Sequence, residues 1–164
     1  MSTINSIIVN TSPGAYYISS GVSESAIELK EVTMDLKFDF VRSVTFGEHI
    51  AKMLDSLIIA YEEYSRENWD GYNAKAINME SYRNAVNFAL SLPFSIPNPD
   101  IYVAPNGKVT FEWYEGKRKN FTVSIGRENE LTFAGLYGAS KEYGVEYIIE
   151  DIPESILERI NRLY

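Results

Sequence analysis

The period at which apolar residues recur changes along the chain, and each change marks an expected element. Positions 32–40 alternate between apolar and polar residues, which is the two-residue period of a strand with one solvated face. Apolar residues then recur every three or four positions over 46–66, the period of an amphipathic helix. A second helix is expected over 79–92, with Asn78 as its N-cap and Pro93 directly after it.

The second half of the chain carries the clearest sheet signal. Apolar alternation over 100–137 is divided by turn signals such as Asn106-Gly107, which favours a tight hairpin, so four antiparallel strands are expected. A fifth strand is expected at 145–149, and Pro153 then begins a last helix. The predicted fold class is α+β: an antiparallel β-meander of four to five strands packed on one face by about three helices, with an extra N-terminal strand or hairpin.

The domain organisation follows from the length and from the absence of internal division. A chain of 164 residues fits one domain, and no repeat or low-complexity tract divides it. We therefore expect a single α+β domain over 1–164, made of four consecutive parts. These are an N-terminal β extension (1–45), a helical pair (46–92), a β-meander (100–150) and a C-terminal helix (153–164).

The charge balance narrows the range of partners. The chain has 23 acidic and 15 basic residues, and its net charge of −8 favours basic partners over a phosphate backbone, so direct nucleic-acid binding is not expected. Without cysteine it can form neither a disulfide nor a thiolate zinc site. No apolar run approaches the ~20 residues of a membrane span, and the first residues lack a secretory pattern. We expect a cytoplasmic protein without membrane contact.

Candidate catalytic groups are few. His49, the single histidine, lies beside the apolar stripe of the first expected helix, where a packing role is expected. Neither a serine-nucleophile motif nor a glycine-rich phosphate loop occurs, and the carboxylates do not have the spacing of a metal site. We therefore expect no catalytic residue, no cofactor and no metal, and infer that the protein is not an enzyme.

The segment that joins the two expected helices is the least typical part of the sequence. It contains Trp69, Asp70, Gly71, Tyr72 and Asn73 without helical or strand periodicity. One interpretation is structural: the Trp packs inward, the Asp accepts backbone N–H groups, and the Gly is a structural turn residue with positive φ. The other is a partner-binding loop, because Trp, Tyr and carboxylate side chains often anchor protein interfaces. The exposure of the two aromatic rings distinguishes the two interpretations.

Three features of the chain together resemble a known group of proteins. They are the W-D-G-Y-x-A motif at 69–74, a proline-rich crossing at 93–99, and a G-x-V-x-x-E-W strand at 107–113. In these features the chain is similar to an uncharacterised family of small bacterial and mobile-element α+β proteins, over residues 46–164. The resemblance implies a fold and a loop of interest. It implies no activity.

The leading functional hypothesis is a non-enzymatic, acidic protein–protein interaction or inhibitor protein of a bacterium, a phage or another mobile element, related to host defence or to a toxin. Its expected partner is a protein, basic or nucleic-acid-handling, bound through Trp69, Asp70, Tyr72 and Asn73, and the acidic surface would then mimic nucleic acid.

Two further interpretations stay open. The alternative is a small-molecule-binding protein or small enzyme with a pocket between the sheet and the first helix, lined by Tyr61, Tyr64, Trp113 and Tyr137 with Asp70 or Glu112 as its polar group. The third is a homo-oligomer formed through an exposed sheet edge.

Overall fold

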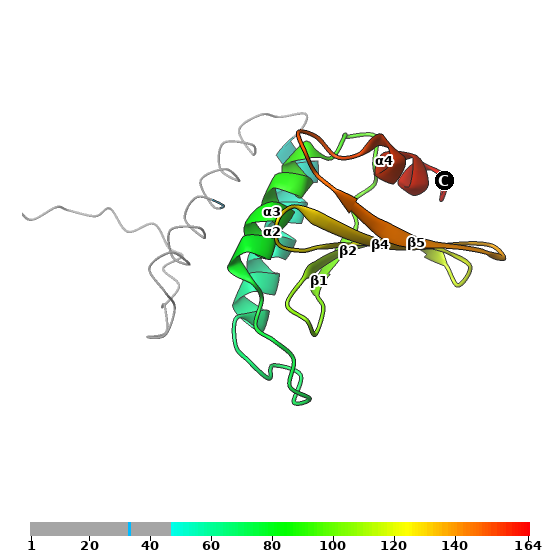
Figure 1. The fold of residues 1–164 in the computed structure, drawn as a ribbon. Coiled ribbons are helices and arrows are strands. Elements are labelled where there is room, and N and C mark those ends of the chain that lie inside the picture. Colours follow the sequence, from blue (N-terminus) through cyan, green and yellow to red (C-terminus); the bar gives the residue numbers. More distant parts are fainter. Residues whose placement is uncertain (1–32, 34–46) are drawn as a thin grey trace, which may run out of the picture.

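The computed structural model describes Thr33 and residues 47–164 (Figure 1). Two helices come first, then five strands and a short final helix, in an order that matches the α+β prediction. In chain order they are α2 (Gly47–Tyr64), α3 (Met79–Ser91), β1 (Asp100–Val103), β2 (Val109–Gly116), β3 (Lys119–Ile125), β4 (Glu130–Tyr137), β5 (Ser140–Tyr147) and α4 (Glu154–Asn161).

The five strands form one antiparallel meander in the order β1-β2-β3-β4-β5. Phe111 lies opposite Val123, which lies opposite Phe133 on the next strand, so one row of apolar side chains crosses the sheet. Along each strand, residues two positions apart point to the same face of the sheet, so this face is apolar on both sides of the row. The predicted meander is therefore confirmed, with five strands.

The three helices within residues 47–164 pack on this apolar face. The ring of Phe88 on α3 lies 4.9 Å from that of Phe111, and the guanidinium of Arg159 on α4 lies 4.4 Å from the centre of the Phe133 ring. Figure 1 shows α2 and α3 side by side, with α4 beyond them near β4 and β5. Helices on one face of an antiparallel sheet confirm the predicted class.

Of two expected element boundaries, one is confirmed and one is wrong. Asn78 caps α3 as expected, because its side chain accepts the N–H of Ser81 at 3.1 Å. The fifth strand is Ser140–Tyr147 and not 145–149, so that prediction was wrong in position. Its inward side chains are Glu142 and Glu146, which pair with Arg159 of α4. The alternation of apolar residues that marks a strand is therefore missing there.

The predicted N-terminal β extension lies almost wholly outside the described residues. Within the strand expected at 32–40, Thr33 alone is described, and it is helical and fully buried. The strand prediction is therefore wrong at this residue. Thr33 hydrogen-bonds to the buried Tyr82 of α3, and such tertiary contacts override a short periodic pattern. The hairpin expected before residue 22 lies outside the described residues.

Candidate functional site

The loop at residues 68–74, which we call the W-D-G-Y loop, is closed by its own hydrogen bonds. The N–H of Asn68 donates to the carbonyl of Ala74 at 2.7 Å, and the N–H of Asn73 donates to Oδ1 of Asn68 at 2.8 Å. The backbone turns through left-handed conformations at Asn68, Gly71 and Asn73, with φ of 58°, 76° and 70°. Asn and Gly are the residues that adopt this conformation most readily, which explains why this short sequence forms so tight a loop.

Asp70 is used inside the loop. Its Oδ1 accepts the N–H of Tyr72 at 2.7 Å and the N–H of Ala74 at 3.0 Å. This is the Asx-type turn expected from the sequence, in which a carboxylate replaces a backbone acceptor. One oxygen of the predicted partner-binding carboxylate therefore holds the loop in shape.

Trp69 fastens the loop to the end of α2. Its indole Nε1 donates to the carbonyl of Lys75 at 3.0 Å, and its ring meets the Tyr64 ring edge to face at 4.6 Å between centroids. The side chain is half-buried. Such aromatic contacts stabilise by about 1 kcal/mol beyond the buried area, so Trp69 has a structural role whatever else it contacts.

Tyr72 has the opposite environment. Its side chain is 87% exposed, although a ring of this size is usually well covered in a monomer. Asn73 is exposed beside it, and a Cβ added to Gly71 would have no atom within 4 Å. The predicted site residues therefore divide: Trp69 and Asp70 support the loop, whereas Tyr72 and Asn73 point into solvent.

The chain after the loop is fixed to the β1–β2 turn. The N–H of Lys75 donates to the carbonyl of Pro105 at 2.8 Å, and the N–H of Asn78 donates to that of Gly107 at 3.1 Å. Gly107 has φ of 81°, and a Cβ there would lie 2.6 Å from the carbonyl oxygen of Ala76. The sequence predicted the Asn106-Gly107 turn but could not indicate this contact, because it joins residues thirty positions apart.

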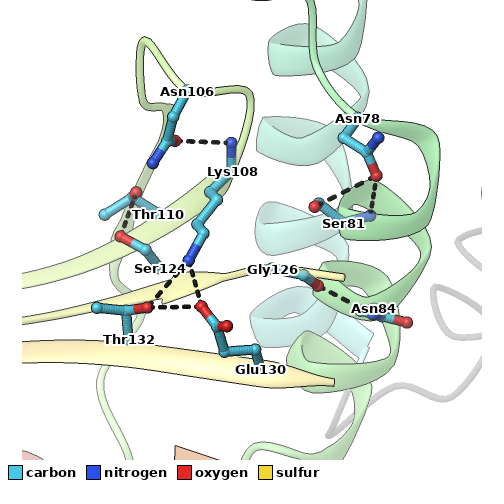
Figure 2. A network of polar contacts seen from close by, with 10 residues as sticks. All are labelled: Asn78, Ser81, Asn84, Asn106, Lys108, Thr110, Ser124, Gly126, Glu130 and Thr132. Carbon is cyan, nitrogen blue, oxygen red and sulfur yellow. Dashed lines mark hydrogen bonds and ion pairs between the residues drawn. The ribbon is translucent and has the colours of Figure 1, made fainter. Parts of the chain in front are cut away.

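An open depression of about 650 Å³ lies beside this contact, between the start of α3 and the β3–β4 turn. Figure 2 shows the polar network at its edge, in which Lys108 forms an ion pair with Glu130 and its Nζ donates to Oγ1 of Thr132 at 3.0 Å. The hydrogen bonds from Lys108 and then Thr132 hold the pKa of Glu130 below its usual value. Lys108, Glu130 and Thr132 therefore serve as hydrogen-bond partners of one another. No sequence pattern indicates this network, because its members come together only through the strand register.

The four aromatic residues of the alternative pocket do not line one cavity. The indole of Trp113 is buried and donates to the carbonyl of Pro97 at 2.7 Å, whereas the Tyr137 hydroxyl donates to the carbonyl of Arg159 at 2.8 Å. Tyr61 packs on the Tyr82 ring at 5.1 Å, and Tyr64 packs on Trp69. A second cavity of about 440 Å³ lies elsewhere, between α3 and residues 148–152.

His49 lies where the sequence placed it, on the flank of α2. It is half-buried, its ring lies edge to face with that of Phe94 at 6.2 Å, and burial lowers its pKa. Within residues 47–164 and at Thr33, no group of three His, Asp or Glu side chains is placed to hold a metal. None of the described helices has the length and apolarity to cross a membrane.

Comparison with known proteins found no family model that matches the chain, and no match among curated proteins or solved structures. The resemblance of the W-D-G-Y-x-A motif to mobile-element proteins therefore stays a prediction carried by its own residues.

Proposed function

We propose that the chain is a non-enzymatic protein-binding module, an interaction or inhibitor protein whose contact surface is the W-D-G-Y loop. The observation that carries this proposal is the 87% exposure of Tyr72 on a loop whose backbone is held by its own hydrogen bonds. A loop that is already ordered loses little conformational entropy on binding. Tyr is also among the residues that contribute most binding energy in protein interfaces.

The charge around the loop favours a basic partner. The end of α2 and the residues after it present the exposed carboxylates of Glu62, Glu63 and Glu67 before the loop, against the basic side chains of Arg66 and Lys75. The whole chain carries a net charge of −8. A basic protein, such as a nucleic-acid-handling protein or a toxin in the cytoplasm of a bacterium, would be attracted at long range, and binding would weaken with salt.

A pull-down with matched tyrosine variants tests the proposal. Tyr72→Ala removes the exposed ring, and Tyr164→Ala removes a ring that is 57% exposed at the other end of the molecule. We expect a basic protein from a bacterial lysate to be retained by the native chain and by Tyr164→Ala. We expect at least tenfold weaker retention by Tyr72→Ala, as for loss of an interface anchor of about 1.4 kcal/mol or more.

Two outcomes would contradict the proposal. One is that the native chain retains no partner. The other is that Tyr72→Ala, with an unchanged circular dichroism spectrum, binds the same partner as tightly as Tyr164→Ala does. Repeating the capture at high salt tests the charge argument separately, because retention that does not fall with salt would exclude a basic partner surface.

A further inference from the structure

The two edges of the sheet differ in how they are protected. The edge strand β1 has four residues, lies between Pro99 and Pro105, and contacts α2. The other edge strand, β5, has eight residues without proline, and no described strand pairs with its outer side. Short length, flanking prolines and a covering helix are the usual means by which proteins block an edge. The β5 edge lacks all three, although Lys141 near its start is a partial guard.

The free backbone groups of β5 can be assigned from one hydrogen bond. The N–H of Ile148 donates to the carbonyl of Asn129, on the β4 side, at 3.0 Å. Backbone groups alternate in direction along a strand, so residues of even number face β4. The N–H and C=O groups of Tyr143, Val145 and Tyr147 therefore face the open edge.

The same three residues place their side chains on the sheet face opposite the helices. Tyr143 is 85% exposed and Val145 is 52% exposed, and Tyr147 is exposed beside them. Alternating aromatic and β-branched residues are the side chains that pair best across antiparallel strands. The edge thus offers backbone groups that no described strand pairs with, and exposed side chains suited to cross-strand contacts.

We propose that a second copy of this chain binds at the β5 edge, pairing β5 with β5 in antiparallel orientation about a two-fold axis at Val145. In this register Val145 faces Val145 of the second copy, and Tyr143 faces Tyr147. Each of these pairs joins residues whose backbone groups face outward, so each exchanges two N–H···O=C bonds. The sheets of the two copies become continuous, and both open edges are closed.

Charge selects this register over its neighbour. On the helix side, pairing about Val145 sets Glu146 opposite Gly144 of the second copy. A shift of the axis to Gly144 would set Glu142 opposite Glu146, and like charges directly opposite are destabilising. Within each copy Arg159 lies 3.0 Å from Glu146 and 3.4 Å from Glu142, so the edge itself is close to neutral despite the acidic chain.

Cysteine cross-linking tests the register. The chain has no cysteine, so every disulfide of Val145→Cys joins two copies. Paired residues of this type have Cα atoms about 5.5 Å apart, within the range that a disulfide spans. We expect Val145→Cys to form a covalent dimer under mild oxidation. The matched control Ile59→Cys, at a position 60% exposed on α2, should stay mostly monomeric.

A proline variant tests the backbone pairing. Val145→Pro removes only an outward N–H and leaves the bonds between β4 and β5 in place. Sedimentation analysis should show a dimer for the native chain and for Val145→Thr. For Val145→Pro the dissociation constant of the dimer should be at least tenfold higher. A native chain that stays monomeric up to its solubility limit overturns the proposal. So does equal cross-linking of the two cysteine variants, a result that does not require Val145→Pro to fold.

Discussion

The two halves of the sheet are covered by helices in different ways. Over β2 and β3 the contact is apolar, and the Phe88 ring of α3 lies 4.9 Å from that of Phe111. Over β4 and β5 the apolar contact of Ile156 and Ile160 is joined by charged groups, because Arg159 of α4 lies over the Phe133 ring and pairs with Glu146. We call these the apolar half and the ionic half.

The two halves therefore differ in the interactions that stabilise them. Apolar burial is non-directional, so the apolar half stabilises the fold through buried area. The ionic half combines the burial of Ile156 and Ile160 with a few charged groups whose geometry must be right, and the short helix α4 covers it. It is also the half in which the outer strand keeps an open edge. The contact that we propose with a second copy lies in this half.

The largest expected effect is a cavity in the apolar half. Phe111→Ala should lower the free energy of unfolding by about 3–5 kcal/mol, because the fully buried ring leaves a cavity. Phe133→Ala should cost about 1 kcal/mol less, since a flexible guanidinium that covers its ring can move into the space. Denaturant unfolding measures both. Equal losses would mean that the two halves are packed alike.

Sequence reasoning succeeded where periodicity reflects burial. The stripe of α2, the cap at Asn78 and the Asn106-Gly107 turn are local signals, and the structure has all three. It failed where an inward residue is charged. Glu142 and Glu146 occupy inward positions of β5, so the alternation of apolar and polar residues that predicts a strand is absent there. Their inward position is explained by Arg159, with which both pair.

In the candidate site, too, the local turns could be predicted from the sequence and the contacts between distant residues could not. The Asx turn at Asp70 follows from its neighbours in sequence, and so does the positive φ of Gly71. The anchoring of the following segment on Gly107 does not, because it depends on where the β1–β2 turn lies after folding. The exposure of Tyr72 likewise follows from the loop geometry and not from residue type.

An intermediate effect is expected at high pH, where one tyrosine in each half is informative. Burial raises the pKa of Tyr82 to about 12, although its hydrogen bond with Thr33 acts in the opposite direction. Burial, and then the charge of Glu142, raises the pKa of Tyr137 to about 12, against the opposing charges of Arg162 and Arg159. Both values lie above the unfolded value of about 10.

Because their pKa values are higher in the folded state, the neutral hydroxyls of Tyr82 and Tyr137 stabilise the fold. This stabilisation is fully present below pH 10 and is lost as the pH rises towards about 12. We expect a loss on the order of 2 kcal/mol from Tyr82, and a smaller one from the partly buried Tyr137. Unfolding free energies measured between pH 9 and pH 12 give the size of this loss. Tyr82→Phe and Tyr137→Phe should each flatten the profile, and a profile unchanged by both would contradict the assignment.

The smallest expected effect concerns the charges of the ionic half. Arg159→Ala leaves the partly buried Glu146 without a guanidinium and Glu142 with Arg162 alone, and should lower the free energy of unfolding by about 1–2 kcal/mol. Arg159→Lys should recover part of this loss, because it keeps the charge but not the planar group over the Phe133 ring. The comparison of both variants by denaturant unfolding separates charge from stacking.

The matched control is an ion pair of the same kind on an exposed surface. Lys52 and Glu48 of α2 lie 2.9 Å apart, with side chains 65% and 86% exposed, so Lys52→Ala should leave the free energy of unfolding nearly unchanged. Added salt should reduce the effect of Lys52→Ala to nothing but leave most of the Arg159→Ala effect, because partly buried charges are screened less. If the two variants respond alike, the charges of the ionic half act only as surface ion pairs, and its stability comes from apolar burial such as that of Ile156 and Ile160.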